Sequence, residues 1–335
     1  MANQKGVQLI KQLQLLRRGL VGEGFLDMVW RHPANVLYWL VKFAYRPFPR
    51  TIFLSKYITF AYCMSDTLSH TNYHDNSFNL DQAGDYILLI QVKGPCFDFA
   101  VVHDNRLLVY VQNTPLDELS SPKPLRGLLS ASYKKVITGL FATALTLVPN
   151  SLYSDEQAAA FARFLDVQDD EKALAERFDD QNHLVYKNGM DIIAAVEKIG
   201  FQNVVYTAQG WVKAIANSSP PNSNLYLNIA GDTVHFLYFS FGSLRFYNRF
   251  EFKNPDELVY FTARVTEELT LSAEEITLCI SGDAYEWDTN LTRLKEFYTK
   301  VELNNLQIFD LPSQVAAHKI LPLAALSLCG SLEVR

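Results

Sequence analysis

The residues of this chain whose types and spacing could do chemistry lie in two runs of sequence that align without gaps. Residues 88–110 read LLIQVKGPCFDFAVVHDNRLLVY, and residues 225–247 read LYLNIAGDTVHFLYFSFGSLRFY. In this alignment Gln91 is matched by Asn228, and Gly94 is matched by Gly231. A glycine in a tight turn directs backbone N–H groups outward, where they can cradle a phosphate. Gln and Asn can accept hydrogen bonds there, but they bring no charge to a divalent ion.

Each copy of the repeat must be positioned by three short strands and two tight turns. The expected strands are Tyr86–Val92, Phe97–His103 and Arg106–Gln112 in the first copy, and Leu225–Ala230, Val234–Phe241 and Leu244–Phe252 in the second. The last of these alternates between apolar and polar residues, which is typical of a strand buried on one side. Its polar side chains, Tyr247, Arg249 and Glu251, are predicted to form either a solvated sheet face under a helix or a partner surface. Asp98 and His235, which are matched in the two copies, are expected to point off their hairpins.

The second half of the chain continues with alternating helices and strands. Asn254 is predicted to cap a helix, a strand follows at Ile276–Ser281, and another helix carries Leu291 and Leu294. A strand at Leu306–Phe309 and a last helix from about Ser313 complete the order β-β-β-α-β-α-β-α. This order matches a ribonuclease-H-like domain, because the right-handed crossover rule leaves few other ways to build the sheet.

The first half shows the same order with insertions. One long strand is predicted at Lys135–Leu147, followed by a helix capped by Ser154, and residues 166–182 are expected to be an exposed acidic stretch. The fold class is therefore α/β, with two ribonuclease-H-like domains, a mixed sheet in each, and an actin-like arrangement across a cleft. The predicted domains are residues 85–217 and 224–335, joined by a linker at 218–223. A flexible leader at 64–84 precedes them.

Four stretches carry a resemblance to a known family. They are Thr146-Leu147-Val148-Pro149, Phe246-Tyr247-Asn248-Arg249-Phe250, Asp256-Glu257-Leu258-Val259-Tyr260-Phe261 and Leu278-Cys279-Ile280-Ser281-Gly282-Asp283. On these stretches, residues from about 86 to 328 resemble the uncharacterised bacterial domain-of-unknown-function family 3822, described as having an actin-like ATPase fold. None of the four stretches is a catalytic signature.

The resemblance also implies where a nucleotide would bind and which groups it would need. Active members of the actin-like superfamily place an Asp at the end of the first strand of each domain, where it holds Mg²⁺ or its water. This chain has neutral side chains there, and only one glycine of the small-Gly-Gly adenosine turn remains. The degenerate cleft positions are Gln91, Gly94, Asn228, Gly231, Asp232, Gly282 and Asp283. No catalytic residue and no metal ligand is predicted, and ATP is the one cofactor left open.

Residues 1–63 differ in composition from the remainder of the chain. They hold nine Lys or Arg and two acidic residues, a charge of +7, whereas the rest holds 21 basic and 34 acidic residues, a charge of −13. This basic N-terminal extension has three open interpretations: a mis-called start with Met64 as the natural one, a membrane-surface or partner arm, and an ordinary structural helix. No apolar run reaches the roughly 18 residues that a membrane-spanning helix needs.

The cysteines and the overall charge limit the setting. Cys63, Cys96, Cys279 and Cys329 form no Cys-x-x-Cys pair, so neither a zinc ribbon nor a disulfide framework is expected, and four free thiols suit the cytoplasm. A net charge of −6 gives no general attraction to nucleic acid.

The leading functional hypothesis is a catalytically silent actin-like module that acts as an assembly scaffold for an unknown protein partner. The alternatives are a divergent nucleotide-binding ATPase or phosphotransferase using Asp232 and Asp283, and a membrane-surface-tethered assembly component using residues 1–63. Pilus and secretion machines use this fold in platform proteins, an analogy at the level of the fold only. The partner, the pathway and the oligomeric state stay open.

Overall fold

The computed structural model of this protein describes residues 73–329, apart from residues 117, 119–124 and 199–202. The basic extension at residues 1–63 and the proposed start at Met64 lie outside the described residues. Within the stretch predicted as a leader, β1 (Tyr73–His74) pairs with β4, and a 3₁₀ helix spans Leu80–Asp85.

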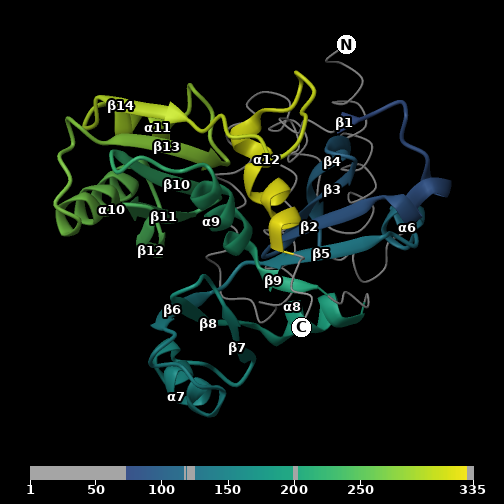
Figure 1. Ribbon diagram of the computed structural model, residues 1–335, viewed down its shortest axis with the longest axis horizontal. Coiled ribbons are helices and arrows are strands. Elements are labelled where there is room, and N and C mark those ends of the chain that lie inside the picture. The colour runs from purple at the N-terminus through teal and green to yellow at the C-terminus, as the bar shows by residue number, and fades with distance from the viewer. Residues whose placement is uncertain (1–72, 117, 119–124, 199–202, 330–335) are drawn as a thin grey trace, which may run out of the picture. The chain divides into compact units, whose positions relative to one another are not determined.

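A six-stranded mixed sheet forms the first half of the described chain (Figure 1). Its strands run in the order β1-β4-β3-β2-β5-β9. The further members are β2 (Ile87–Lys93), β3 (Cys96–His103), β4 (Arg106–Pro115), β5 (Lys135–Leu140) and β9 (Val204–Tyr206). β2, β3 and β4 are antiparallel to one another, whereas β2, β5 and β9 are parallel.

A second sheet repeats this arrangement with the strand order β12-β11-β10-β13-β14. Its strands are β10 (Asn224–Ala230), β11 (Thr233–Ser240), β12 (Ser243–Glu251), β13 (Thr277–Gly282) and β14 (Lys300–Leu303). The order and the strand directions equal those of β4, β3, β2, β5 and β9. The expected ribonuclease-H-like strand order is therefore present in both halves. The strand predicted at Leu306–Phe309 is wrong, because the fifth strand of this sheet is β14.

The hairpins of the two sheets have the register that the gap-free alignment requires. Gln91 lies opposite Asp98 in the first hairpin, and Asn228 lies opposite His235 in the second. In each hairpin the turn glycine, Gly94 or Gly231, follows the first residue of this pair by the same number of positions. Residues that are matched in the alignment therefore occupy equivalent positions in the two hairpins.

A third, three-stranded sheet has the order β6-β8-β7 and stands beside α7 (Figure 1). β6 (Ala144–Pro149) follows β5 after a break at residues 141–143, so the single strand predicted at Lys135–Leu147 is two strands in different sheets. β7 (Glu171–Arg177) lies within the stretch predicted to be exposed and acidic, and β8 (Asn182–Gly189) pairs with both neighbours. We call these three strands the small sheet.

The helix predicted after Ser154 is divided into short pieces. A 3₁₀ turn at Asp155–Gln157 precedes α7 (Ala158–Ala162), and a second 3₁₀ turn follows at Arg163–Leu165. The Ser154 side chain makes no capping hydrogen bond, so the predicted capping box is wrong. A run of three alanines gives this helix little apolar area to bury, which accounts for its shortness.

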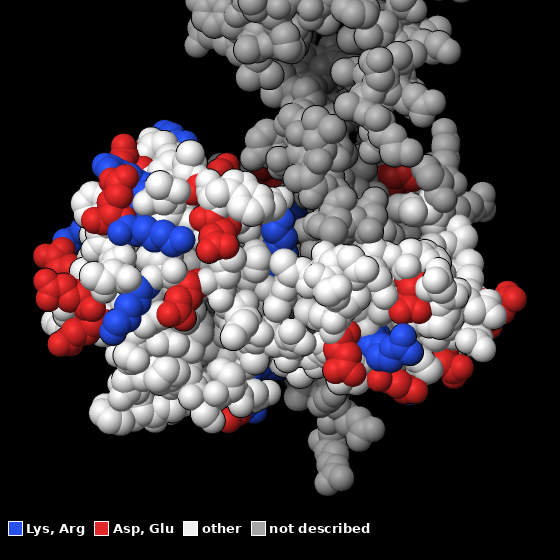
Figure 2. Space-filling view, turned by 90° about the horizontal axis from the view of Figure 1, so that it is seen from above, with Lys and Arg blue, Asp and Glu red and all other residues white. Residues whose placement is uncertain are grey.

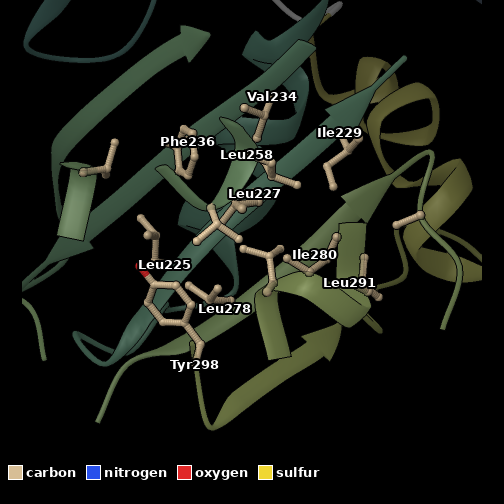
Figure 3. Close-up of a cluster of buried hydrophobic side chains, with 14 of the residues drawn as sticks. Leu225, Leu227, Ile229, Val234, Phe236, Leu258, Leu278, Ile280, Leu291 and Tyr298 are labelled. Atoms are coloured by element: carbon tan, nitrogen blue, oxygen red, sulfur yellow. The ribbon is translucent and has the colours of Figure 1, made fainter. Parts of the chain in front are cut away.

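Helices α10 (Pro255–Glu268) and α11 (Thr289–Lys295) lie next to the second sheet (Figure 1). Asn254 caps α10 as predicted, since its side chain accepts a hydrogen bond from Glu257 N at 2.9 Å. Figure 3 shows the core between them. Its labelled residues are Leu225, Leu227, Ile229, Val234, Phe236, Leu258, Leu278, Ile280, Leu291 and Tyr298. Burial of these side chains, at roughly 1.5–3 kcal/mol each, holds β10, β11 and β13 in place.

The other face of the second sheet contributes to a separate core. This core includes Tyr206, Trp211, Tyr226, Leu237 and Tyr247. α9 (Thr207–Asn217) and α12 (Ala317–Ala324) pack here, and α12 contacts β2, β3 and β13. A Cβ atom at Gly210 would lie 2.4 Å from Ala325 O, so the close approach of α9 to the 3₁₀ helix after α12 requires glycine. The remaining helices are α6 (Arg126–Leu129) and α8 (Met190–Lys198).

The composition led to expectations about surface charge and about free thiols, and the described residues bear on both. On the face that Figure 2 shows, Lys and Arg side chains are interspersed with Asp and Glu, and no continuous basic patch is visible. Cys279 and Cys329 are free, whereas Cys96 is disulfide-bonded, so the expectation of four free thiols is wrong at Cys96. None of the described helices is long and apolar enough to cross a membrane.

Candidate functional site

The two glycine turns of the repeat have the backbone conformation that the sequence predicts for them. Gly94 (φ 64°) and Gly231 (φ 60°) both adopt the left-handed region. Only glycine occupies this region without a steric penalty, and such a turn directs consecutive N–H groups to one side. No atom beyond the chain neighbours lies within 4 Å of the Cβ position of Gly94, so the first turn is open.

Gln91 and Asn228 are the two strand positions at which the resemblance implies a carboxylate in active members of the superfamily. Both are buried, with 3% and 1% of their surface exposed. Gln91 donates from Nε2 to Thr207 Oγ1 at 3.0 Å, so its amide group is engaged within the protein. Asn228 Oδ1 has no hydrogen-bond partner among the described residues. The two positions are therefore equivalent in the sheet but differ in how their polar groups are satisfied.

Lys93, at the end of β2, joins carboxylates from both halves of the chain. Its Nζ atom lies 2.6 Å from Asp98 Oδ2 and 3.4 Å from Asp283 Oδ1. Asp98 belongs to β3 and is 3% exposed at its side chain, whereas Asp283 follows β13. Asn113 N also donates to Asp98 Oδ1 at 2.8 Å. We call Lys93, Asp98 and Asp283 the Lys93 bridge.

The electrostatics of the Lys93 bridge follow from burial and charge. Burial lowers the pKa of Lys93, but the negative charges of Asp283 and Asp98 outweigh it and raise that pKa above its ordinary value. Burial raises the pKa of Asp98, and the nearby ammonium group of Lys93 opposes this effect. A buried carboxylate is stable only with a paired cation and hydrogen bonds. Lys93 therefore stays protonated and supplies the positive charge between the two carboxylates.

Asp283 also contacts the second glycine turn directly. Gly231 N donates to Asp283 Oδ2 at 3.2 Å, and Asp283 N donates to Ile229 O at 2.7 Å. The carboxylate thus accepts from a backbone N–H of the kind that would otherwise face a phosphate. Gly282 (φ 86°) precedes it, and a Cβ atom there would lie 2.1 Å from Ile229 O. Only glycine fits where β13 passes β10 at this point.

The structure brings four of the seven predicted cleft residues together. Gly231 and Asp283 are in contact, with Gly282 and Asn228 adjacent to them, since the Gly282 Cβ position is 2.5 Å from Asn228 Oδ1. Asp232 is exposed, and its carboxylate contacts Thr233 instead. Neither Lys93 nor Asp98 was among the predicted site residues. A lone carboxylate in the apolar run Cys96–His103, across a hairpin from a lysine, was the signal that could have identified them.

His235 and Tyr247 do not point into solvent as the sequence suggested. His235 is fully buried, and its Nδ1 atom lies 2.8 Å from the Tyr247 hydroxyl, which in turn lies 2.6 Å from the Tyr206 hydroxyl. Burial, together with the charge of Arg249, lowers the pKa of His235 to about 3. The expectation that Asp98 and His235 point off their hairpins is wrong, because both side chains are buried.

The contacts of Arg249 show that the polar face of β12 is also less exposed than the sequence predicts. Its guanidinium donates to Thr143 O in the segment between β5 and β6, and to Thr233 Oγ1 at 3.3 Å and Glu251 Oε1 at 3.0 Å. This face is covered by protein rather than by solvent at Tyr247 and Arg249. It holds the second sheet against the segment that leads into the small sheet.

The described side chains offer no ready metal site. No group of three or more His, Cys, Asp or Glu residues is placed to hold a metal ion in the part of the chain that the structure describes. Asp232 lies in the second glycine turn and is exposed, whereas Asp98 and Asp283 are both engaged with Lys93. Chemically, the two carboxylates can bind an ammonium group, and that of Lys93 already lies between them.

Comparison with known proteins gives one family and a set of similar structures. A family model described as "Protein of unknown function (DUF3822)" matches residues 75–301. No curated protein matches the chain.

Similar solved structures align with most of this chain. A Bacteroides thetaiotaomicron protein with an actin-like ATPase fold and unknown function aligns at TM-score 0.62 with 18% identity, over 75% of this chain and 99% of that one. The type IV pilus biogenesis complex PilM–PilN aligns at TM-score 0.48 with 12% identity, over 72% of this chain and 97% of that one. The ethanolamine utilization protein EutJ from Carboxydothermus hydrogenoformans aligns at TM-score 0.39 with 9% identity, over 72% and 90% of the respective chains. The first of these similarities shows that the chain has an actin-like ATPase fold.

Proposed function

The chain belongs to the DUF3822 family of proteins of unknown function and has an actin-like ATPase fold, and we propose that it is a catalytically silent module that serves as a scaffold for another protein. The Lys93 bridge is the observation that carries this proposal. An ATPase of this fold needs a divalent cation beside its phosphate turns, and that cation needs free carboxylates. Here a lysine ammonium lies between the carboxylates of Asp98 and Asp283, at 2.6 Å and 3.4 Å.

Two further features support the loss of turnover. Gln91 and Asn228 are neutral where a metal-binding carboxylate is required, and the amide of Gln91 is already bonded to Thr207. The N–H group of Gly231 donates to Asp283 rather than facing an open turn. A phosphate would have to displace this internal carboxylate and would meet its negative charge.

The proposal is tested by titrating the full-length protein with ATP and Mg²⁺ in a calorimeter, and by measuring phosphate release in parallel. We expect no turnover in the wild type. The matched variants are Asn228→Asp and Asn228→Gln, because only the first restores a carboxylate at the end of β10. Phosphate release by the wild type that is lost in Asp232→Asn or Asp283→Asn would overturn the proposal and would favour the phosphotransferase alternative.

The scaffold part of the proposal needs a separate readout. The full-length protein, cross-linked in extracts of its host, is expected to capture a protein partner whether or not ATP and Mg²⁺ are added. A partner that is captured only with hydrolysable ATP would contradict a silent scaffold, because binding would then depend on turnover. If the wild-type protein captures no partner in any extract but releases phosphate from ATP, the chain is an enzyme instead.

A further inference from the structure

β14 is an edge strand of the second sheet, and the backbone groups on its outer side are free. The strand order places β13 on one side of β14 and no described strand on the other (Figure 1). Asn304 N donates to Ile280 O of β13, and successive residues of a strand alternate in the side to which their backbone groups point. Val301 and Leu303 therefore direct N–H and C=O outward, where these groups bond to nothing else in the described part.

The repeat supplies an internal comparison, because β9 holds the place of β14 in the first sheet. Thr138 N of β5 donates to Asn203 O, so Tyr206, three residues later, directs its N–H away from β5. This outward N–H donates to Glu176 Oε1 of β7 at 2.8 Å, and the edge of β9 is thereby closed. Within the described residues the edge of β14 has no such cover. An edge that is left open in this way is a template for another strand.

The core of the second half reaches this edge without being fully covered. The side chains of Val301 and Leu303 pack against the core cluster beneath α10 and α11, yet both are only half-buried. Phe297, in the turn that leads from α11 to β14, is 52% exposed. A further strand beside β14 would remove apolar surface of this core from water, which favours association.

The two charged residues of β14 are matched to each other in a second copy. Lys300 and Glu302 alternate with Val301 and Leu303, so they lie on the opposite face of the strand, and both are exposed. Neither takes part in an ion pair within the described part of the chain. Lys300 Nζ makes one long hydrogen bond, 3.3 Å to Glu275 O, which leaves the ammonium group with donors to spare.

One antiparallel register satisfies the backbone and the charges together. Residues with outward groups must face one another to exchange hydrogen bonds. Centring the pair on Val301 places Val301 opposite its own counterpart and Leu303 opposite Thr299, which alternation also directs outward. Lys300 then faces Glu302 of the second copy on both sides of the axis, and such facing opposite charges stabilise a strand pair. Centring on Glu302 would place two carboxylates opposite each other, and centring on Lys300 two ammonium groups.

From the open edge, the uncovered core and the charge pattern, we propose that two copies of this chain form a symmetric dimer by antiparallel pairing of their β14 strands, centred on Val301. The two five-stranded sheets then join into one continuous sheet. A two-fold axis perpendicular to that sheet keeps α10 and α11 of both copies on the same face. This dimer goes beyond the scaffold role, since it depends neither on a nucleotide nor on a different protein.

The dimer is tested on the full-length protein by sedimentation velocity over a range of concentrations. Lys300→Glu places two carboxylates opposite each other and is expected to weaken dimerisation about tenfold or more. Glu302→Lys should do the same with two ammonium groups. The double variant Lys300→Glu/Glu302→Lys exchanges the charges and should dimerise like the wild type. Circular dichroism checks that each variant is folded.

This recovery separates the dimer from a general effect of charge on the fold. A wild type that is monomeric at every concentration would overturn the proposal. So would a double variant that dimerises no better than the two single variants, because the paired charges would then not face each other.

A cross-link reports the register directly. Lys300→Cys and Glu302→Cys are each made with Cys279→Ser, because Cys279 lies beside Glu302 in the neighbouring strand. In the proposed pair these two positions are directly opposite, with Cα atoms about 4.5 Å apart, which a disulfide can span. Mild oxidation of the mixed proteins should therefore give a linked dimer, whereas each protein alone should stay unlinked. Equal linking in the mixture and in the separate proteins would contradict this register.

Discussion

Lys93 Nζ lies 2.6 Å from Asp98 Oδ2, and the Asp98 side chain is only 3% exposed. The pair stands at the turn end of the first hairpin, and the third residue of the bridge, Asp283, belongs to the other half of the chain. A buried ion pair contributes little net stability, but the loss of one partner leaves a desolvated charge behind. The Lys93 bridge is therefore a point where a single substitution has a large effect.

Lys93→Ala is expected to lower the free energy of unfolding by about 3–5 kcal/mol, because Asp98 then remains buried without a cation. Adding Asp98→Asn to this variant should recover part of the loss, since the neutral amide costs less to bury. Urea denaturation measures both. The control is Lys134→Ala, which removes an exposed lysine. Equal effects of Lys93→Ala and Lys134→Ala would show that the bridge is not formed in solution.

His235 predicts a loss of stability in acid. Its pKa is lowered to about 3 by burial and by Arg249, whereas the unfolded chain takes up the proton near pH 6.5. The stabilising effect is complete above pH 6.5 and decreases as the pH falls towards 3, by about 2 kcal/mol between pH 7 and pH 5. His235→Gln is expected to lose less stability over this interval than the wild type. Parallel curves for the two proteins between pH 7 and pH 5 would contradict the assignment.

Glu176 predicts the opposite trend at higher pH. Burial raises its pKa to about 7 in the folded protein, so the folded state keeps a proton that the unfolded chain releases near pH 4.5. Stability from this group is complete below pH 4.5 and is lost as the pH rises through 7, by about 2–3 kcal/mol between pH 5 and pH 8. Glu176→Gln retains an acceptor for Tyr206 N and should be flatter in this range, measured in dilute samples. Glu274→Gln, at an exposed glutamate, is the control.

Gly282→Ala is expected to destabilise the fold by several kcal/mol or to prevent folding. Its backbone has φ 86°, and the new Cβ atom would lie 2.1 Å from Ile229 O. Gly94→Ala is the matched comparison, because Gly94 also has a positive φ of 64° but nothing lies within 4 Å of its Cβ position. That variant should lose only about 1–2 kcal/mol, the cost of the left-handed conformation alone. Thermal unfolding distinguishes the two, and similar melting temperatures would mean that the contact with Ile229 is relieved.

The hairpins could be predicted from sequence because their signals are local. Alternating apolar residues and turn glycines place Gly94 and Gly231, and the strand register then follows from the alignment. The end of β5 could not be predicted in this way, since residues 135–147 together are typical of one strand. The chain leaves the first sheet where Gly139 approaches Thr207 and Leu326, which are distant in sequence.

The candidate site was predicted only in part for the same reason. Gly231, Gly282 and Asp283 follow from the position of the strand ends, but the role of Lys93 depends on a residue 190 positions away. A local sequence pattern cannot connect two residues that are so far apart in the chain. His235 was misjudged because its polar type suggested exposure, whereas two tyrosine hydroxyls from separate strands surround it.

The chain enters and leaves the small sheet at one place, where Thr143 N donates to Lys187 O at 3.0 Å. Residues 144–186 therefore form an excursion whose two ends already meet at its base. Evolution can lengthen, shorten or replace such an insert while the ribonuclease-H-like sheet on which it stands keeps its strand order. Residues Phe178, Leu184 and Tyr186 of the excursion belong to the same core as Tyr206 and Trp211, so diversity among members of this family should concentrate in the parts of the excursion outside that core.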